Sequence, residues 1–238
     1  MIAAIKRLYR MIFCRGGHGV HSPFVFDLLT NVIEEKASYY CYDSLSLVRL
    51  QLRQDGSNLR HENREYTVEK YIDRFCFSEC EDRLLFRLAN RFRPRTIYLM
   101  GCDLGLAPLY LTAYSGSVHC IAVEQDPDVA AVAQKFVDKY SSSKIDINIS
   151  GSLDIPDDSV IDFFVCGGGG VAFEKILPFM SDESIMIIPE INKSSKNRNT
   201  WKEICAHPRI TVTLDLCSFG IVFFNPRLNR RTYKSFVL

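Results

Sequence analysis

The stretch TIYLMGCDLGLAPLYL, residues 96–111, contains the pattern of a strand, a turn and a helix in direct succession. Thr96–Met100 is a β-branched and aromatic run of the kind found in buried strands. Gly101 and Gly105 frame a turn, and an apolar pattern with helical spacing begins at Leu106. Because glycine lacks a Cβ, the backbone of such a turn can approach a ligand closely.

The residues before this unit predict a mainly helical segment. Ser22 can cap a helix whose first residue is Pro23, and Ser78 with Glu81 forms a capping box for a helix that ends before Pro94. The segments expected between residues 23 and 93 are helices at 23–35, 43–54, 67–77 and 78–93, with a polar loop at 55–66.

After residue 95 apolar strands alternate with helices, which predicts an α/β fold with a parallel sheet covered on both faces. The last two strands are joined around Cys217 and Ser218 by a connection too short for a parallel crossover. They are therefore expected to form an antiparallel hairpin. The basic segment that follows, NPRLNRRTYKSF, is interpreted as a solvated surface.

Composition narrows the class of protein. The chain has 238 residues, of which 47% are hydrophobic, and 29 Lys and Arg against 28 Asp and Glu leave a net charge of +1. This balance gives no electrostatic reason to expect a nucleic-acid partner. The nine cysteines show no metal-binding spacing. No apolar run reaches the roughly 18–20 residues that span a bilayer, so the cytoplasm is the expected location.

With Glu124 at the end of the second strand, this arrangement resembles the class I S-adenosylmethionine-dependent methyltransferases over residues 78–225. The segments GHGVHSPFVFDLL and TWKEICAHPRITVTLDLCSFGIVFF are similar to a bacterial branch of O-methyltransferases in that superfamily. The resemblance implies a Rossmann-like, seven-stranded sheet with a C-terminal antiparallel hairpin. It also implies a methyltransferase domain at 78–238 with a helical N-terminal extension at 1–77.

S-adenosylmethionine is the cofactor that this resemblance implies. Glu124 is expected to accept the ribose hydroxyls, with an ordinary cap of the next helix as the alternative. Either Ser152 or Asp154 would lie beside the adenine. The residues expected to bind the cofactor are Gly101, Asp103, Gly105, Glu124, Gln125, Ser152 and Cys166.

Several positions depart from the family pattern. Leu99 stands where the family has an acidic residue that orients the cofactor's ammonium group. A lost charge-assisted hydrogen bond costs roughly 1.5–3 kcal/mol, so weakened cofactor binding is expected, and complete loss is the alternative. Cys166 and four glycines replace an aspartate after the fourth strand, and Glu190 and Asn192 are too few oxygen ligands to predict a metal.

Two functions therefore remain open. The first is a methyltransferase that acts on a small-molecule acceptor, in which Glu190, His18 or His21 are the candidates for a general base. Packing of the loop is the alternative for the two histidines, and a buried apolar role is favoured for Cys166. The second function is a catalytically degenerate protein with a binding or regulatory role. The amphipathic N-terminal segment is consistent with a homodimer.

Overall fold

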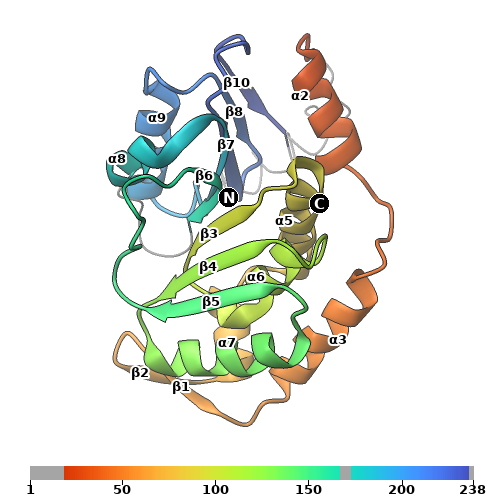
Figure 1. Ribbon diagram of the computed structural model, residues 1–238, viewed down its shortest axis with the longest axis vertical. Coiled ribbons are helices and arrows are strands. Elements are labelled where there is room, and N and C mark those ends of the chain that lie inside the picture. Colours follow the sequence, from red (N-terminus) through yellow and green to blue (C-terminus); the bar gives the residue numbers. More distant parts are fainter. Residues whose placement is uncertain (1–18, 167–172, 236–238) are drawn as a thin grey trace. The chain divides into compact units, whose positions relative to one another are not determined.

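The computed structural model describes residues 19–166 and 173–235 (Figure 1). Contacts within the chain define two compact units. Unit 1 comprises Met1–Lys36 and Asp157–Leu238, and unit 2 comprises Ala37–Pro156. The predicted boundary between residues 77 and 78 stays a prediction.

Unit 2 begins with helices and a hairpin. Thr67 caps one helix and Ser78 forms the predicted capping box of another, with its hydroxyl accepting from Glu81 N–H and the Glu81 carboxylate accepting from Ser78 N–H. The elements are α3 (Tyr42–Arg53), β1 (Asn58–His61), β2 (Arg64–Thr67), α4 (Val68–Phe75) and α5 (Glu79–Phe92).

The hairpin of β1 and β2 corrects the sequence prediction of a loop at 55–66. The two strands pair antiparallel, and Glu62 and Asn63 connect them with φ angles of 48° and 62°. Left-handed backbone at both central residues matches the twist of a two-residue hairpin connection. Apart from Leu59 and Tyr66, the two strands carry polar side chains, so they show no apolar alternation that a sequence pattern could reveal.

The second half of unit 2 is a parallel sheet in the order β3, β4, β5. α7 packs on β4 and β5, and α6 packs on α5. The elements are β3 (Thr96–Met100), η2 (Asp103–Gly105), α6 (Leu106–Thr112), β4 (His119–Glu124), α7 (Pro127–Tyr140) and β5 (Lys144–Ile149), and each lies where the sequence predicted a strand, turn or helix.

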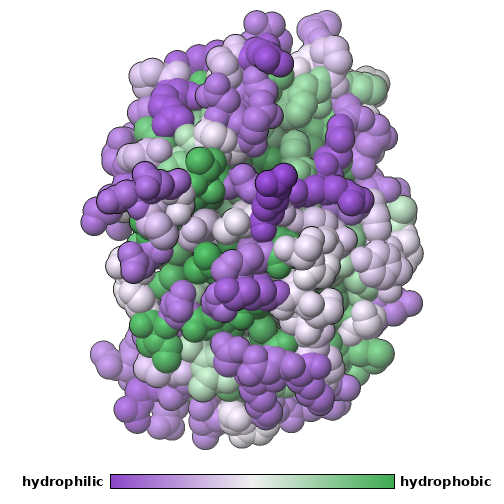
Figure 2. All heavy atoms as spheres, viewed as in Figure 1, coloured by the Kyte–Doolittle hydropathy of each residue, from purple (hydrophilic) through white to green (hydrophobic). Residues whose placement is uncertain are grey.

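β5 forms one edge of the sheet. Ile145, Ile147 and Ile149 alternate along it with Lys144, Asp146 and Asn148, and Ile149 is 61% exposed. Figure 2 shows apolar side chains gathered over the region of β4 and β5. Charged side chains on an edge strand hinder pairing with a further strand, so Lys144 and Asp146 protect this edge.

In unit 1 the strand order is β6, β7, β9, β8, β10. β6 and β7 pair parallel, and β8 and β9 form the predicted antiparallel hairpin. The elements are α2 (Pro23–Leu28), η1 (Leu29–Ile33), β6 (Ile161–Cys166), α8 (Phe173–Ile176), η3 (Leu177–Phe179), β7 (Met180–Pro189), α9 (Ser195–Ala206), β8 (Val212–Asp215), β9 (Phe219–Phe223) and β10 (Arg231–Lys234).

β10 is a strand that the sequence did not predict. It pairs parallel with β8, and the basic segment that contains it is mostly exposed, as predicted for a solvated surface. Its apolar content is the single buried Tyr233 between exposed residues, which is too little for a strand signal.

The core of unit 1 contains Trp201 and Phe223, which are 7% and 4% exposed. A Cβ on Gly220 would lie 2.4 Å from the Trp201 ring, so glycine is required where β9 passes this side chain. No helix in the described part of the chain is long and apolar enough to cross a membrane.

Candidate functional site

The turn between β3 and α6 is held in a strained conformation. Gly101 (φ 81°) donates its N–H to the carbonyl of Val123 at 2.7 Å, and Asp103, Leu104 and Gly105 follow with φ angles of 48°, 52° and 88°. Left-handed backbone costs a non-glycine residue roughly 1–2 kcal/mol. Surrounding structure must therefore hold Asp103 and Leu104, and strain of this kind clusters at functional sites.

Gly105 has a packing role in this structure. A Cβ at this position would lie 3.0 Å from the carbonyl oxygen of Ala133 and 3.1 Å from Cγ2 of Val137, both in α7. The positive φ adds a second reason for glycine. Close packing of the turn on α7 thus accounts for Gly105, and its predicted contact with a cofactor stays a prediction.

Glu124 joins the turn to the end of β4. Its Oε2 accepts the N–H of Cys102 at 3.1 Å, and its Oε1 accepts the N–H groups of Gln125 and Asp126 at 2.8 and 3.1 Å. Only 8% of the residue is exposed. The Cys102 thiol also forms a hydrogen bond with this carboxylate, so its donors approach the roughly four acceptor positions that a carboxylate offers. The bond to Asp126, the residue that precedes α7, also suits the capping alternative.

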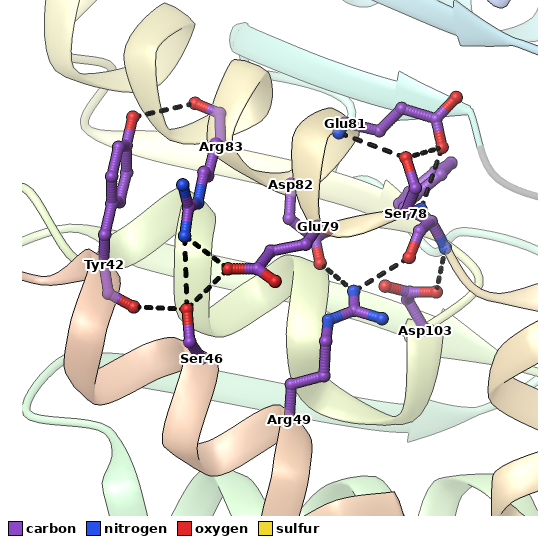
Figure 3. Close-up of polar contacts among 10 residues, drawn as sticks. Tyr42, Ser46, Arg49, Ser78, Glu79, Glu81, Asp82, Arg83 and Asp103 are labelled. Carbon is purple, nitrogen blue, oxygen red and sulfur yellow. Dashed lines mark hydrogen bonds and ion pairs between the residues drawn. The ribbon is translucent and has the colours of Figure 1, made fainter. Parts of the chain in front are cut away.

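The side chain of Asp103 lies against the connection between α4 and α5 (Figure 3). Its Oδ1 accepts the N–H of Phe77 at 3.0 Å. Its Oδ2 is buried, and the Cys76 thiol and the Ala107 N–H also form hydrogen bonds with this carboxylate. Burial of a carboxylate favours its protonated form.

Arg49 and Asp82 complete a buried polar network next to Asp103. Arg49 Nη2 donates to Asp82 Oδ2 at 2.5 Å and to the carbonyl of Phe77 at 2.8 Å (Figure 3). Asp82 is fully buried, and its Oδ1 lacks a partner among the described residues. Two carboxylates thus face the positive charge of Arg49.

This arrangement raises the pKa of both aspartates. Burial raises the pKa of Asp103 to about 7, and hydrogen bonds from the Cys76 thiol and the Phe77 N–H together with the charge of Arg49 oppose the rise. Burial and then the neighbouring Asp103 raise the pKa of Asp82 well above its usual range. The pair therefore holds at least one proton under mildly acidic conditions.

The hairpin and α4 are attached to the segment that follows Glu124. His61 Nδ1 forms a short contact with Asp126 Oδ2, and the N–H of Arg60 donates to Asp128 Oδ2 at 3.0 Å. The His61 ring packs edge-on against Tyr71 and Phe75 of α4. Burial, and then the charge of Glu124, raise the pKa of Tyr71, so α4 lies beside the turn and the end of β4.

Gln125 and Ser152 are both exposed and follow consecutive strands of unit 2. The N–H of Ser150 donates to the Glu124 carbonyl at 2.9 Å, which places the start of this loop beside β4. Ser150 Oγ in turn accepts the Ser152 N–H at 3.2 Å. The structure thus brings Gly101, Asp103 and Glu124 together and starts the Ser152 loop beside them, while the adenine contact stays a prediction.

The other predicted residues lie in unit 1 or outside the described residues. Burial raises the pKa of Cys166 to about 12, which keeps the thiol protonated and agrees with an apolar role. Glu190, with φ 58°, accepts from Lys193 Nζ at 2.5 Å, and His21 is exposed. His18 lies outside the described residues.

Residues 19–166 and 173–235 contain no group of three or more His, Cys, Asp or Glu side chains arranged to hold a metal ion. Asn192, considered above with Glu190, donates to the carbonyl of Cys217 at 2.9 Å.

Sequence reasoning missed Arg49, Asp82 and His61. A signal existed for two of them. Asp82 occupies the helical phase of Leu85, Phe86 and Ala89, and Arg49 that of Leu45 and Leu52. A charged residue on an apolar helix face predicts a buried ion pair. His61 gave no such signal, because its partner Asp126 is distant in the sequence.

No protein-family model and no curated protein matches the sequence. Solved structures of methyltransferases match the fold. The O-methyltransferase from Bacillus cereus in complex with SAH is 15% identical, with 84% of this chain and 97% of that chain covered and a TM-score of 0.58.

Two further structures give similar values. A cofactor-bound protein from MTB is 13% identical, with 77% and 90% of the two chains covered and a TM-score of 0.61. The O-methyltransferase TomG from Streptomyces achromogenes, in complex with SAM, is 11% identical, with 84% and 94% covered and a TM-score of 0.54. At these identities the likeness shows the fold, which is the Rossmann-like methyltransferase fold.

Proposed function

We propose that the chain is an S-adenosylmethionine-dependent methyltransferase that acts on a small-molecule acceptor. The observation that carries the proposal is the junction of Glu124 with the strained turn after β3, where Cys102 N–H donates to Glu124 Oε2. Acidic residues at the ends of adjacent parallel strands are typical nucleoside sites in α/β folds. The solved neighbours that contain SAM or SAH support the same cofactor here.

The residues present fit this cofactor at Glu124, a carboxylate at the junction of β4 with the turn after β3, which suits a ribose hydroxyl. When bound, S-adenosylmethionine supplies an electrophilic methyl group on a sulfonium. The chain itself would orient the cofactor and exclude water, and both effects accelerate a displacement reaction without an acid or base of the protein.

The exposed Glu190 and His21 remain the described candidates for a general base that activates a hydroxyl acceptor. We also propose that the protein is cytoplasmic, that it forms a homodimer and that it belongs to the bacterial O-methyltransferase branch. Sedimentation of the purified chain tests the dimer.

Calorimetric titration of the cofactor-free chain with S-adenosylmethionine and S-adenosylhomocysteine tests the proposal. We expect micromolar dissociation constants for both. No heat of binding at millimolar ligand would contradict it and would favour the alternative, a catalytically degenerate protein with a binding or regulatory role. A panel of phenolic and carboxylic acceptors with methyl-labelled cofactor then tests the activity itself.

A further inference from the structure

The outer face of α3 carries apolar side chains that unit 2 leaves exposed. Leu47 and Leu50 are 58% and 51% exposed, and Tyr40, two residues before the helix, is 78% exposed. Among the described residues of unit 2, Ile149 is the only other large apolar residue with a comparable exposure. A helix face in water normally presents charged side chains, and grouped apolar residues on a surface mark a contact with another molecule. α3 packs against α4, α6 and α7 through its buried residues, so the exposed face is available to a partner.

Four exposed residues of α3 and its C-cap form a stripe along the helix. The members of this stripe are Asp43, Leu47, Leu50 and Gln54. Their spacings of four, three and four residues keep the side chains on one side of the helix. Leu47 and Leu50 flank the centre of the stripe, and the other two members lie equally far from it. A two-fold axis through this centre places Leu47 of one chain against Leu50 of the other, and such a self-matching surface is what a symmetric dimer requires.

The charges at the two ends of the stripe fit an antiparallel pair of helices. Asp43 lies in the first turn of α3. Gln54, at the other end, borders a groove of about 320 Å³ that two lysines of α7, Lys135 and Lys139, also line. The antiparallel arrangement places Asp43 of a second copy opposite Gln54, where its carboxylate meets the positive charge of Lys139. A parallel arrangement would instead oppose like charges, so the charges select the antiparallel one.

We propose that α3 is a homodimer interface, in which its exposed stripe packs antiparallel on the same stripe of a second copy. This inference rests on the homodimer in the proposed function, and it depends on neither the cofactor nor the reaction. Each helix has 12 residues and is about 18 Å long. Two helices of this length bury less surface than a standard protein interface, so we expect a dissociation constant in the micromolar range.

The test compares two double variants of the full chain by sedimentation equilibrium across the micromolar range. One combines Leu47→Glu with Leu50→Glu, and the other combines Leu47→Lys with Leu50→Lys. Both leucines are more than half exposed, so these substitutions leave the core of unit 2 intact. Val160→Glu is the matched control, because it changes an apolar residue of similar exposure, 55%, in unit 1.

We expect each double variant alone to associate at least about a hundredfold more weakly than the wild type, because four like charges meet at the interface. Val160→Glu should associate like the wild type. An equimolar mixture of the two double variants should form a heterodimer, because the acidic side chains of one chain then face the basic side chains of the other. Formation of this heterodimer also shows that both variants are folded.

Wild-type association in a double variant would overturn the interface and would point to another surface, such as the amphipathic N-terminal segment outside the described residues. Two monomeric variants that form no heterodimer when mixed would overturn the antiparallel pairing.

The wild type gives a result that does not depend on the folding of any variant. Amide hydrogen exchange in residues 42–54 should be slower above the dissociation constant than below it. Equal exchange at both concentrations would overturn the role of α3 in a chain that still dimerises. A wild type that stays monomeric would overturn the homodimer together with the interface, and would leave the calorimetric test of cofactor binding unaffected.

Discussion

Arg49 and Asp103 are linked through the backbone of one residue, Phe77. Its carbonyl accepts from Arg49 Nη2 at 2.8 Å, and its N–H donates to Asp103 Oδ1 at 3.0 Å. Phe77 is thus fixed on both sides by charged groups, one from α3 and one from the turn after β3. The connection between α4 and α5 is therefore coupled to the ionisation of Asp103.

This coupling predicts how the stability of the free protein depends on pH. The folded pKa of Asp103, about 7, lies above the unfolded value of about 4, so the native state binds more protons between these values. The free energy of unfolding should fall as the pH rises from 4 to 7. Urea unfolding of Asp103→Asn should show a smaller fall, whereas the exposed Asp158→Asn should follow the wild type. A wild-type slope in Asp103→Asn would contradict the prediction.

Asp55 predicts a pH dependence of the opposite sign. Hydrogen bonds from Lys135 and Ser57 lower its pKa to about 2. Its contribution to stability is present above the unfolded pKa of about 4 and is lost as the pH falls toward 2. Asp55→Asn should lower the free energy of unfolding by about 1–2 kcal/mol at pH 7. The difference from wild type should shrink when urea unfolding is repeated at pH 2.5, and a constant difference would refute this account.

Gly105→Ala should destabilise the protein by about 1–3 kcal/mol, because the added Cβ meets the backbone of α7 and the residue must keep a positive φ. Gly56→Ala is the control, since a Cβ there has no atom within 4 Å. It should stay within about 0.5 kcal/mol of wild type. Urea unfolding measures both, and equal effects of the two substitutions would show that α7 does not constrain Gly105.

Glu124→Gln should cost about 1–3 kcal/mol of stability, because an amide can no longer accept from Cys102 N–H and from the Gln125 and Asp126 N–H groups together. Glu203→Gln, on the exposed side of α9, should leave the midpoint of urea unfolding unchanged. A neutral Glu124→Gln variant would mean that these three hydrogen bonds contribute nothing net to the folded state.

His61→Ala should loosen the hairpin while leaving the rest of unit 2 folded. His61 contacts Asp126 and packs on Tyr71 and Phe75, so its removal lowers the local opening free energy of residues 58–67. Amide hydrogen exchange there should accelerate by about tenfold. Arg60→Ala is the matched control, since its 71% exposed side chain only approaches Glu65 at 3.9 Å. Similar acceleration in both variants would contradict a specific role of His61.

The strands and helices after residue 95 were predictable because each is an apolar run of the right length between turn residues. The hairpin of β1 and β2 was not, because its stability depends on Asp126 and Asp128, which lie far along the chain. β10 could not be predicted either, because it is a strand only through its pairing with β8.

The sequence predicted where the candidate site lies, but not the hydrogen bonds and ion pairs within it. The glycines and Glu124 follow strands that a sequence pattern reveals, so their meeting at one end of a parallel sheet could be inferred. The sequence did not predict that Glu124 accepts three backbone N–H groups or that Asp103 lies near Arg49 and Asp82. Both depend on side-chain directions and on packing between α3 and α5.

Phe24 of α2 packs edge-on against Phe223 of β9 with ring centroids 5.1 Å apart. During synthesis, at about 5–20 residues per second, the continuous segment of unit 2 emerges whole roughly ten seconds or more after α2 and before β9 exists. During this time the apolar side chains of α2, among them Val25 and Leu28, lack the strand that packs against Phe24. The packing of α2 therefore depends on one of the last strands of the chain to be synthesised.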